Sequence, residues 1–195
     1  QGVQIGVLSN SECVWHTDMA YIEEPPSASI LYALEVTESG GETGFLNMYA
    51  ALDALPNKLR RCVQNRRLKH ENVTLSDGTI REGMEDQIPD SNDVRDWQGP
   101  YHPIIRSHPE TNRPALFLGR RVNAYIEGLP VRESEEILDQ IWGYTTRPEN
   151  TWTQEWQVGD LVMWDNRCVM HRRGAFNADE HRLLYRTQLK GDRPY

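Results

Sequence analysis

Residues 161–172 read LVMWDNRCVMHR, two short apolar runs on either side of the polar triplet Asp165-Asn166-Arg167. Runs of this length, rich in aliphatic and aromatic residues and bounded by Asp and Asn, predict two β-strands joined by a turn. We therefore expect strands at residues 161–164 and 168–172. His171 lies inside the second of them.

The same pattern recurs along the chain. It predicts further strands at residues 28–36, 44–48, 67–71, 103–107, 115–118, 152–158 and 183–189. Apolar residues at helical spacing predict one helix over residues 49–64 and a second that begins at Glu133, after Pro130. We find no internal repeat and no linker in the sequence. Many short strands with two peripheral helices favour a single, mainly β domain, folded as a sandwich or a barrel-like roll.

The overall composition is that of a globular chain, and it limits the partners. The chain has 195 residues, of which 38% are hydrophobic and 26% charged, and its formal net charge is -8. This acidic charge argues against nucleic acid and anionic membranes as partners. The longest apolar stretches, such as residues 30–34, are too short to span a bilayer, and no basic-then-apolar leader precedes them.

The cysteines indicate a cellular compartment. Cys13, Cys62 and Cys168 are widely spaced, and they form no CxxC pair. Neither a disulfide framework nor a thiolate zinc site is expected from three such residues. The sequence is therefore typical of a protein of the reducing cytoplasm.

Charge is unevenly distributed along the chain. Residues 82–96 contain six acidic residues and one base, Arg95, in a stretch that lacks periodicity and is rich in turn formers. This pattern predicts a long loop, and long loops in compact domains are either disordered or functional. We expect residues 73–100 to form a lid or pocket wall, with a disordered loop as the alternative. By contrast, the chain from Arg167 to its end carries seven bases and three acidic residues.

The segment Trp15-His16-Thr17-Asp18 offers a metal-binding pair. If it is extended, His16 and Asp18 point to the same face and can bind one divalent cation. The pair alone is weak evidence, because the HxD pattern also arises by chance. His171 is the best candidate for a third ligand, although a single histidine in a strand is more often a core or surface residue. Two histidines and one carboxylate on one side of a metal are typical of non-haem Fe(II) oxygenases.

The charge that follows His171 suits such an enzyme. Fe(II) oxygenases of this type commonly use 2-oxoglutarate, whose distal carboxylate is well matched by the fork of an arginine. Arg182 stands eleven residues after His171 in the next expected strand, and Arg186 lies on the same face of that strand. A solvated basic stripe is the alternative interpretation.

Five blocks of sequence resemble a known family. They are WHTDMAYIEEPP (15–26), SGGETGFLNMYAALDALP (39–56), HPIIRSHPETNRPALFLG (102–119), VGDLVMWDNRCVMH (158–171) and HRLLYRTQLKGDRP (181–194). Together they resemble the taurine dioxygenase and 2,4-dichlorophenoxyacetate dioxygenase group of Fe(II)/2-oxoglutarate-dependent oxygenases. The resemblance covers nearly the whole chain and implies a double-stranded β-helix, also called a cupin-like jelly roll, with a few flanking helices.

The resemblance also implies an activity and a site. The activity would be hydroxylation of a small anionic substrate, a sulfonate or carboxylate, by Fe(II), 2-oxoglutarate and dioxygen, with release of succinate and CO2. The implied iron ligands are His16, Asp18 and His171, and the presence of Asp18 argues against a halogenase. The other implied contacts are Arg182 and Thr43 with the distal carboxylate of 2-oxoglutarate, Trp164 with the iron and cosubstrate site, and Arg186 with the acidic group of the substrate.

Two departures from the family limit what the resemblance implies. Family members extend further on the N-terminal side, whereas fifteen residues precede His16 here. We therefore expect residues 1–195 to be one dioxygenase domain that lacks its N-terminal part. Residues 73–100 also differ from both named relatives, so the identity of the substrate does not carry over. Relatives commonly associate, which makes a homo-oligomer one expected form.

Other interpretations remain open. A non-catalytic, cupin-like protein could bind a metal or a small anion with the same residues. A zinc hydrolase would use two histidines and an aspartate, but it leaves Arg182 and Thr43 without a role. We expect structural or exposed positions for His70, His102 and His108, and packing positions for Trp142, Trp152 and Trp156. Arg120 and Arg121 are expected to face the solvent, with the pocket as the alternative.

Overall fold

The computed structural model describes residues 13–75, 78–177 and 179–195. Within these residues, two antiparallel three-stranded sheets carry the fold. The β1 sheet contains, in order, β11 (Leu183–Leu189), β1 (Ala28–Glu35) and β9 (Leu161–Asp165). The β2 sheet contains, in order, β10 (Val169–Arg173), β2 (Thr43–Asn47) and β8 (Thr151–Gln154).

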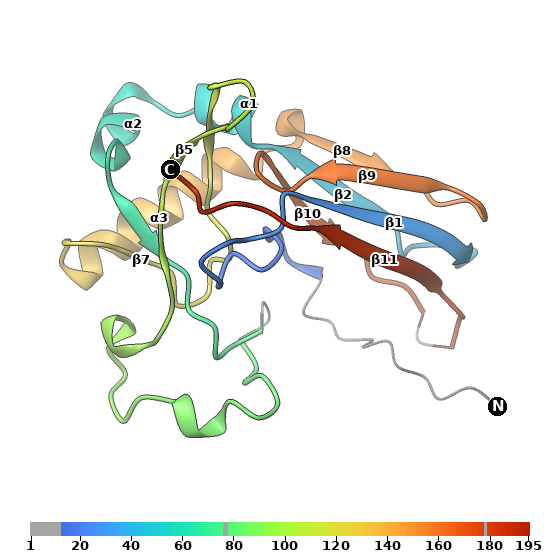
Figure 1. Ribbon diagram of the computed structural model, residues 1–195, viewed down its shortest axis with the longest axis horizontal. Helices are drawn as coiled ribbons and strands as arrows, with labels where there is room; N and C mark the ends of the chain where they lie inside the picture. Colours follow the sequence, from blue (N-terminus) through green and yellow to red (C-terminus); the bar gives the residue numbers. More distant parts are fainter. Residues whose placement is uncertain (1–12, 76–77, 178) are drawn as a thin grey trace.

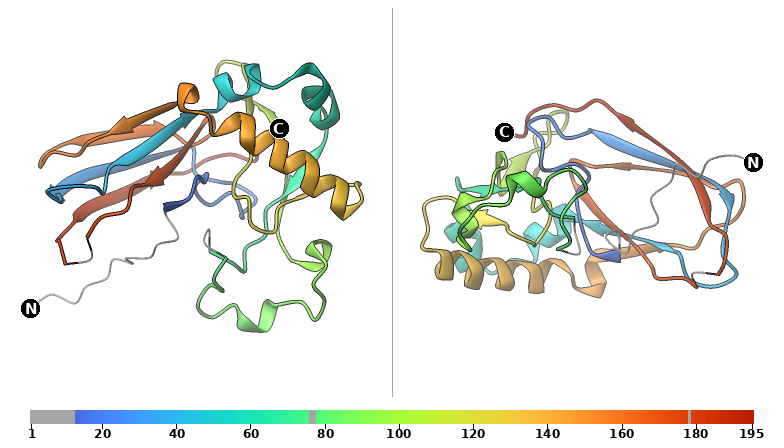
Figure 2. Two further views of the ribbon diagram at one scale, coloured as in Figure 1. Left: turned by 180° about the vertical axis from the view of Figure 1, so that it is seen from behind. Right: turned by 90° about the horizontal axis from the view of Figure 1, so that it is seen from below.

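The two sheets face each other across a shared interior (Figure 2). The ring of Trp164 in β9 has its centroid 5.4 Å from that of Phe45 in β2 and 4.6 Å from that of His171 in β10. Because side chains alternate between the two faces of a strand, the opposite face of the β1 sheet points outward. Tyr32 and Tyr185, which pair directly across β1 and β11, are exposed there. The interior near His171 is therefore aromatic.

The helices and the shorter strands pack together at one end of the two sheets (Figure 1). They comprise α1 (Met48–Asp53), α2 (Asn57–Val63), α3 (Val131–Thr145), the sheet of β4 (Tyr101–Pro103), β3 (Arg67–Lys69) and β7 (Tyr125–Ile126), and the hairpin of β5 (Ile105–Ser107) and β6 (Pro114–Leu116). The main apolar core lies here and includes Leu52, Leu116 and Leu138. It extends to Leu46 of β2 and Met170 of β10, which anchor the β2 sheet to the helices.

The prediction of one helix over residues 49–64 is wrong. The chain forms α1 and α2 instead, with Pro56 at the N-cap of α2. Proline has no N–H to donate and its ring obstructs the preceding turn, so a helix cannot continue through this position. The second helix, α3, is present, but it begins at Val131, two residues before the expected Glu133, directly after Pro130.

The expected strands are present with shifted boundaries. The strand expected over 103–107 is divided between β4 and β5, and the short strand β7 was not expected. The strand expected over 152–158 ends at Gln154 as β8. Its continuation turns, because the carboxylate of Asp160 accepts hydrogen bonds from the Gln154 side chain and the Gln157 backbone N–H.

Residues 82–100 form an irregular loop, as expected, with two short 3-10 turns, η2 (Glu85–Gln87) and η3 (Val94–Asp96). A third turn, η4 (Pro148–Asn150), precedes β8. The ammonium group of Lys69 donates a hydrogen bond to the carbonyl of Val94 and so ties the loop to β3. In the part of the chain that the structure describes, no helix combines the length and the apolar character needed to cross a bilayer.

Candidate metal centre

The structure brings His16, Asp18 and His171 together in the interior between the sheets. The Nε2 atoms of both histidines lie 3.7 Å from Oδ1 of Asp18, and the two imidazole centroids are 4.3 Å apart. All three side chains are buried. One ligand atom from each residue lies within 4.8 Å of the others, which is close enough for a single cation to contact all three.

Backbone pairing places the first two residues beside the third. The N–H of His16 donates to the carbonyl of His171 at 3.0 Å, and the N–H of His171 donates to the carbonyl of His16 at 2.9 Å. This pair of bonds forms an isolated antiparallel bridge between the HxD segment and β10. The HxD segment thus runs alongside the strand that carries His171, and His16 and Asp18 reach the same point from it.

Both imidazoles can present a nitrogen lone pair to a cation. Nδ1 of His16 lies 2.9 Å from the carbonyl of Val14. Because a carbonyl only accepts, Nδ1 carries a proton, and in the neutral ring this leaves the lone pair on Nε2, which faces Asp18. Burial lowers the pKa of His171 to about 3, the neighbouring His16 contributing in the same direction, so this ring is neutral near pH 7.

The carboxylate of Asp18 is ionised. Burial by itself would raise its pKa, but His171, Arg186 and His16 together with a hydrogen bond from Ser29 outweigh burial and hold the pKa well below its usual range. Oδ1 lies 2.5 Å from Nη2 of Arg186, whose side chain remains 34% exposed. The buried carboxylate of Asp18 is therefore paired with a guanidinium that is partly exposed to solvent.

Arg182 and Thr43 lie near each other but make protein contacts. Nε of Arg182 donates to the carbonyl of Gly41 at 3.1 Å. Gly41 has a φ of +68°, and a Cβ at this position would lie 3.1 Å from the Arg182 side chain, so both its backbone and its neighbour favour glycine. Thr43 is buried two residues further on, and its Oγ1 accepts a hydrogen bond of 2.9 Å from Nε1 of Trp156. Trp156, expected only to pack, is thus a polar contact of a candidate site residue.

Two further residues that contact Asp18 were not expected from the sequence. Ser29 donates from its hydroxyl to Oδ2 of Asp18, and the amide side chain of Asn166 bonds to the Asp18 backbone. Asn166 could have been noticed from the sequence, because it lies in the WDNR segment of a block that resembles the family. Ser29 is a polar residue in the otherwise apolar strand β1, which is a weaker signal.

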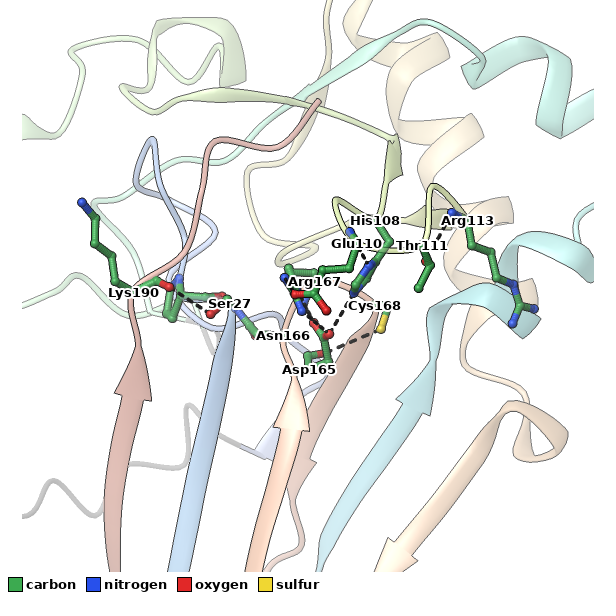
Figure 3. Close-up of polar contacts among 11 residues, drawn as sticks. Ser27, His108, Glu110, Thr111, Arg113, Asp165, Asn166, Arg167, Cys168 and Lys190 are labelled. Atoms are coloured by element: carbon green, nitrogen blue, oxygen red, sulfur yellow. Dashed lines mark hydrogen bonds and ion pairs between the residues drawn. The ribbon is translucent and has the colours of Figure 1, made fainter.

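A second cluster of metal-binding residue types consists of His108, Asp165 and Cys168 (Figure 3). Asp165 accepts four hydrogen bonds, three from Arg167 and one from Nε2 of His108. A carboxylate offers about four lone-pair sites, so these donors saturate it. Nδ1 of His108 accepts from the N–H of Glu110 at 3.3 Å, and burial raises the pKa of the Cys168 thiol to about 11. This cluster joins two loops, and its carboxylate and imidazole have no lone pair left for a cation.

The remaining expectations have mixed outcomes. His70, His102 and His108 are buried, in agreement with structural positions. Trp152 is 57% exposed and contacts Phe45 by stacking. Arg121 forms ion pairs with acidic residues of α3, whereas the expected solvent position of Arg120 is wrong. Arg120 is half-buried, since its guanidinium stacks on Tyr21 and donates to the carbonyl of Thr74.

The donor set of His16, Asp18 and His171 fits a divalent iron-type cation. Two neutral imidazole nitrogens and one carboxylate on one side of a metal leave the other side for additional ligands. A cavity of about 660 Å³ lined by Trp15, Gly44 and Arg172 lies on the other face of the β2 sheet, and none of the three donors lines it. The three donors therefore lie in the aromatic interior beside Trp164 and not at this cavity.

Known proteins are similar to this chain in sequence. Residues 1–188 match the family described as Taurine catabolism dioxygenase TauD, TfdA family. The alpha-ketoglutarate-dependent 2,4-dichlorophenoxyacetate dioxygenase of Cupriavidus pinatubonensis is 34% identical over 96% of this chain and 63% of its own length. The alkylsulfatase of Acinetobacter baylyi is 31% identical over 97% of this chain and 59% of its own length. The chain thus spans about 60% of the length of these curated relatives.

Solved structures of known proteins are also similar to this chain in fold. The chain is similar to AAD-2, solved in complex with Mn(II) and N-oxalylglycine, with a TM-score of 0.79 and 28% identity over 94% of this chain and 71% of that one. A taurine dioxygenase from Burkholderia xenovorans superposes with a TM-score of 0.77 and 31% identity over 98% of this chain and 63% of that one. The mainly β fold with few helices, expected as a double-stranded β-helix, is confirmed. The chain belongs to the taurine catabolism dioxygenase TauD, TfdA family.

Proposed function

We propose that the protein is an Fe(II)- and 2-oxoglutarate-dependent dioxygenase that hydroxylates a small anionic organic substrate and releases succinate and CO2. The observation that carries the proposal is the buried cluster of His16, Asp18 and His171, in which two imidazole nitrogens lie 3.7 Å from one carboxylate oxygen. The relatives support it, because their names describe alpha-ketoglutarate-dependent enzymes that act on phenoxyacetate and phenoxypropionate acids and on sulfonates.

Each site residue has a role in this proposal. His16, Asp18 and His171 hold the metal, which when bound supplies the redox chemistry that links decarboxylation of 2-oxoglutarate to oxidation of the substrate. Arg182 pairs its guanidinium with the distal carboxylate of 2-oxoglutarate, because an arginine fork matches a carboxylate in geometry and charge. The hydroxyl of Thr43 donates a hydrogen bond to the same carboxylate. Trp164 keeps water away from the metal side of the interior.

Arg186 is the proposed contact for the acidic group of the substrate. Its guanidinium lies beside Asp18, and 34% of its side chain is exposed, so an anion that enters from solvent can meet it next to the metal ligands. A sulfonate, carboxylate or sulfate ester presents two or more acceptor oxygens to such a guanidinium. The substrate class is therefore proposed as small organic acids.

Residues 73–100 are proposed as a pocket wall of a single dioxygenase domain. The guanidinium of Arg81 lies 4.6 Å from the ring of Tyr21, and Arg120 donates to the carbonyl of Thr74. Tyr21 follows Asp18 by three residues, so these contacts support a segment that borders the site. A deletion of residues 82–96 is expected to raise the KM for the organic acid more than the KM for 2-oxoglutarate.

The proposed location is the cytoplasm, and the proposed partner is the small-molecule substrate. Cys13, Cys62 and Cys168 are free thiols, which a reducing compartment maintains. A homo-oligomer is the proposed form in solution. Light scattering after size-exclusion chromatography tests the oligomeric state, and fractionation of the source cells tests the location.

Succinate release tests the proposed activity. The protein is supplied with Fe(II), 2-oxoglutarate and oxygen and is screened against small sulfonates, aryloxyacids, amino acids and alkyl sulfate esters. We expect one class of acid to stimulate succinate formation, and we expect anaerobic addition of Fe(II) and 2-oxoglutarate to produce a visible charge-transfer band. Metal binding without the band and without succinate in any condition would identify a non-catalytic binding protein instead.

A further inference from the structure

The orientation of the Asp18 carboxylate needs a physical cause. The last torsion of an aspartate side chain is broad and nearly two-fold, so either oxygen can face a given direction. Here Oδ1 faces both imidazoles, at 3.7 Å from each Nε2, and Oδ2 points away from them. A ligand that is held in one orientation before the cation arrives loses less conformational freedom on binding it.

A hydroxyl group holds the second oxygen. The Oγ of Ser29 in β1 donates to Oδ2 of Asp18 at 2.6 Å, and Ser29 is fully buried. Nε2 of Gln188 donates to the same Oγ at 3.2 Å, from the position directly opposite Ser29 in β11. Because the amide already supplies a proton to Oγ, the single hydroxyl proton is directed to Asp18. The two hydrogen bonds therefore run in a fixed direction, from Gln188 to Ser29 and from Ser29 to the carboxylate of Asp18.

An amide side chain holds the backbone of the same residue. Oδ1 of Asn166 accepts from the N–H of Asp18 at 2.9 Å, and Nδ2 of Asn166 donates to the carbonyl of Asp18 at 3.0 Å. Nδ2 also donates to the carbonyl of Pro26 at 2.9 Å, which fixes the orientation of the amide because a flipped side chain would turn its oxygen toward two carbonyls. Asn166 is 1% exposed and follows β9, the neighbour of β1.

The two contacts act on one ligand from two directions. Asn166 sets where the Asp18 backbone lies, and Ser29 on Oδ2, together with Arg186 on Oδ1, sets how its carboxylate is turned. We propose that Ser29 and Asn166 are positioning residues that present Oδ1 of Asp18 to a divalent cation shared with the two histidines. This inference rests on the proposed function, since it assigns the same three residues as ligands. Loss of such outer contacts typically lowers metal affinity 10- to 100-fold.

The test measures Mn(II) binding to the protein by electron paramagnetic resonance, without turnover. Ser29→Ala removes the hydroxyl that donates to Oδ2 of Asp18, and Ser27→Ala is the matched control. Ser27 lies two residues away, and its hydroxyl donates to the carbonyl of Lys190 at 2.9 Å rather than to a site residue (Figure 3). Ser29→Cys keeps the side-chain volume but replaces a strong donor with a weak one. Asn166→Asp keeps the shape and one acceptor while it removes both amide donors.

We expect Ser29→Ala and Ser29→Cys to raise the dissociation constant for Mn(II) about 10-fold, and Asn166→Asp by at least as much, with Ser27→Ala unchanged. The d–d absorption spectrum of bound Co(II) should change in the Ser29 variants and not in Ser27→Ala. A merely structural role for the serine would lower the melting temperature without moving either signal.

Each outcome decides the proposal. If folded Ser29→Ala, or Ser29→Cys where the alanine variant does not fold, binds Mn(II) within twofold of Ser27→Ala and leaves the Co(II) spectrum unchanged, the positioning role is wrong. If wild-type protein binds no Mn(II), the ligand assignment itself is wrong and the proposed function falls with it. Weakened binding in the Ser29 variants and in Asn166→Asp, beside normal binding in the wild type and in Ser27→Ala, supports the inference, whereas unchanged binding in folded Asn166→Asp overturns the role of Asn166.

Discussion

Among the described residues, two clusters of possible metal ligands are found, and they differ in what their lone pairs contact. His16, Asp18 and His171 meet between the sheets, while His108, Asp165 and Cys168 meet where β9 turns into β10. In the first cluster one carboxylate oxygen faces two imidazole nitrogens at 3.7 Å. In the second, four N–H groups already occupy the carboxylate.

The difference shows that proximity alone does not make a metal site. Arg167 places its fork and its backbone N–H on Asp165, so that cluster is a closed hydrogen-bond network that ties the loop around His108 to the turn after β9. Asp18 instead receives its serine and its arginine on different oxygens. A cation can compete for a carboxylate held in that way, but not for one whose lone pairs are all taken.

Removal of one histidine from each cluster should have the largest and most unequal effect. We expect His171→Ala to abolish Mn(II) binding at micromolar concentrations and to abolish succinate formation, because two ligands rarely hold a divalent cation. His16→Ala should behave in the same way. We expect His108→Ala to keep one Mn(II) per chain, measured by equilibrium dialysis. A loss of the bound metal in His108→Ala would show that the two clusters have been assigned the wrong way round.

The next effect concerns the cosubstrate. Arg182→Ala should raise the KM for 2-oxoglutarate by about 100-fold, because loss of one partner of a charge-assisted pair costs 2–5 kcal/mol, while Mn(II) affinity stays within a few-fold. Arg172→Ala is the control. Arg172 is also in this region, but it stacks on Trp15, 4.7 Å from the ring, on the other face of the β2 sheet. Equal KM values for the two variants would contradict the assignment of Arg182.

Each cluster also has an arginine beside its carboxylate, Arg186 beside Asp18 and Arg167 beside Asp165. Of the two, Arg186 is the proposed substrate contact. We expect Arg186→Ala to weaken binding of the acidic substrate by about 10-fold or more, in line with loss of an ion-pair contact, and to change the 2-oxoglutarate requirement less. The ratio of the two KM changes, taken with the substrate found in the succinate screen, is the measurement. Equal losses for substrate and cosubstrate would count against a substrate contact.

Asp165→Asn should change stability rather than metal binding. The substitution removes the charge that pairs with Arg167, whose side chain is only 14% exposed. We expect a loss of about 2 kcal/mol in the free energy of unfolding, typical of hydrogen bonds to charged groups, measured by urea denaturation. Mn(II) stoichiometry should remain at that of the wild type. A stable variant that loses its metal would reverse the roles given to the two clusters.

The smallest effect lies in the chemistry of Cys168. Burial, assisted by the charge of Asp165, raises the pKa of this thiol to about 11, so below that pH the protonated form dominates and the thiolate is scarce. The rate of alkylation by iodoacetamide should therefore keep rising with pH past 9, with a midpoint near 11, when followed by mass spectrometry of the Cys168 peptide. A midpoint near 9 would indicate an ordinary thiol and an open cluster.

Local sequence patterns predicted much of this arrangement. The strand parity of the HxD segment placed His16 and Asp18 at one point, and the apolar runs on either side of Asp165-Asn166-Arg167 predicted β9 and β10 within one residue. The partnership with His171 depends on a pairing across 155 residues, which periodicity cannot predict. His171 was the best candidate from its place in an apolar strand, and the family resemblance implied it as a ligand. A local rule was also missed, because Pro56 should have ended the helix that was expected to pass through it.

The supporting contacts were beyond local reasoning. Ser29 and Asn166 both bond to Asp18, but Asn166 is 148 residues away along the chain, and only the packing of β1 beside β9 brings them together. His108 and Asp165 are likewise separated by 57 residues. Long-range packing leaves one carboxylate open to a cation and closes the other, and the residue types of the two clusters do not by themselves reveal this difference.

The most direct test of the account is the position of a bound cation. Crystals of the protein soaked in Mn(II) would be measured for anomalous scattering. The account predicts one anomalous peak within bonding distance of Nε2 of His16, Oδ1 of Asp18 and Nε2 of His171, and none at His108, Asp165 and Cys168. A peak at the second cluster, or ordered protein with no peak between the two histidines and Asp18, would contradict it.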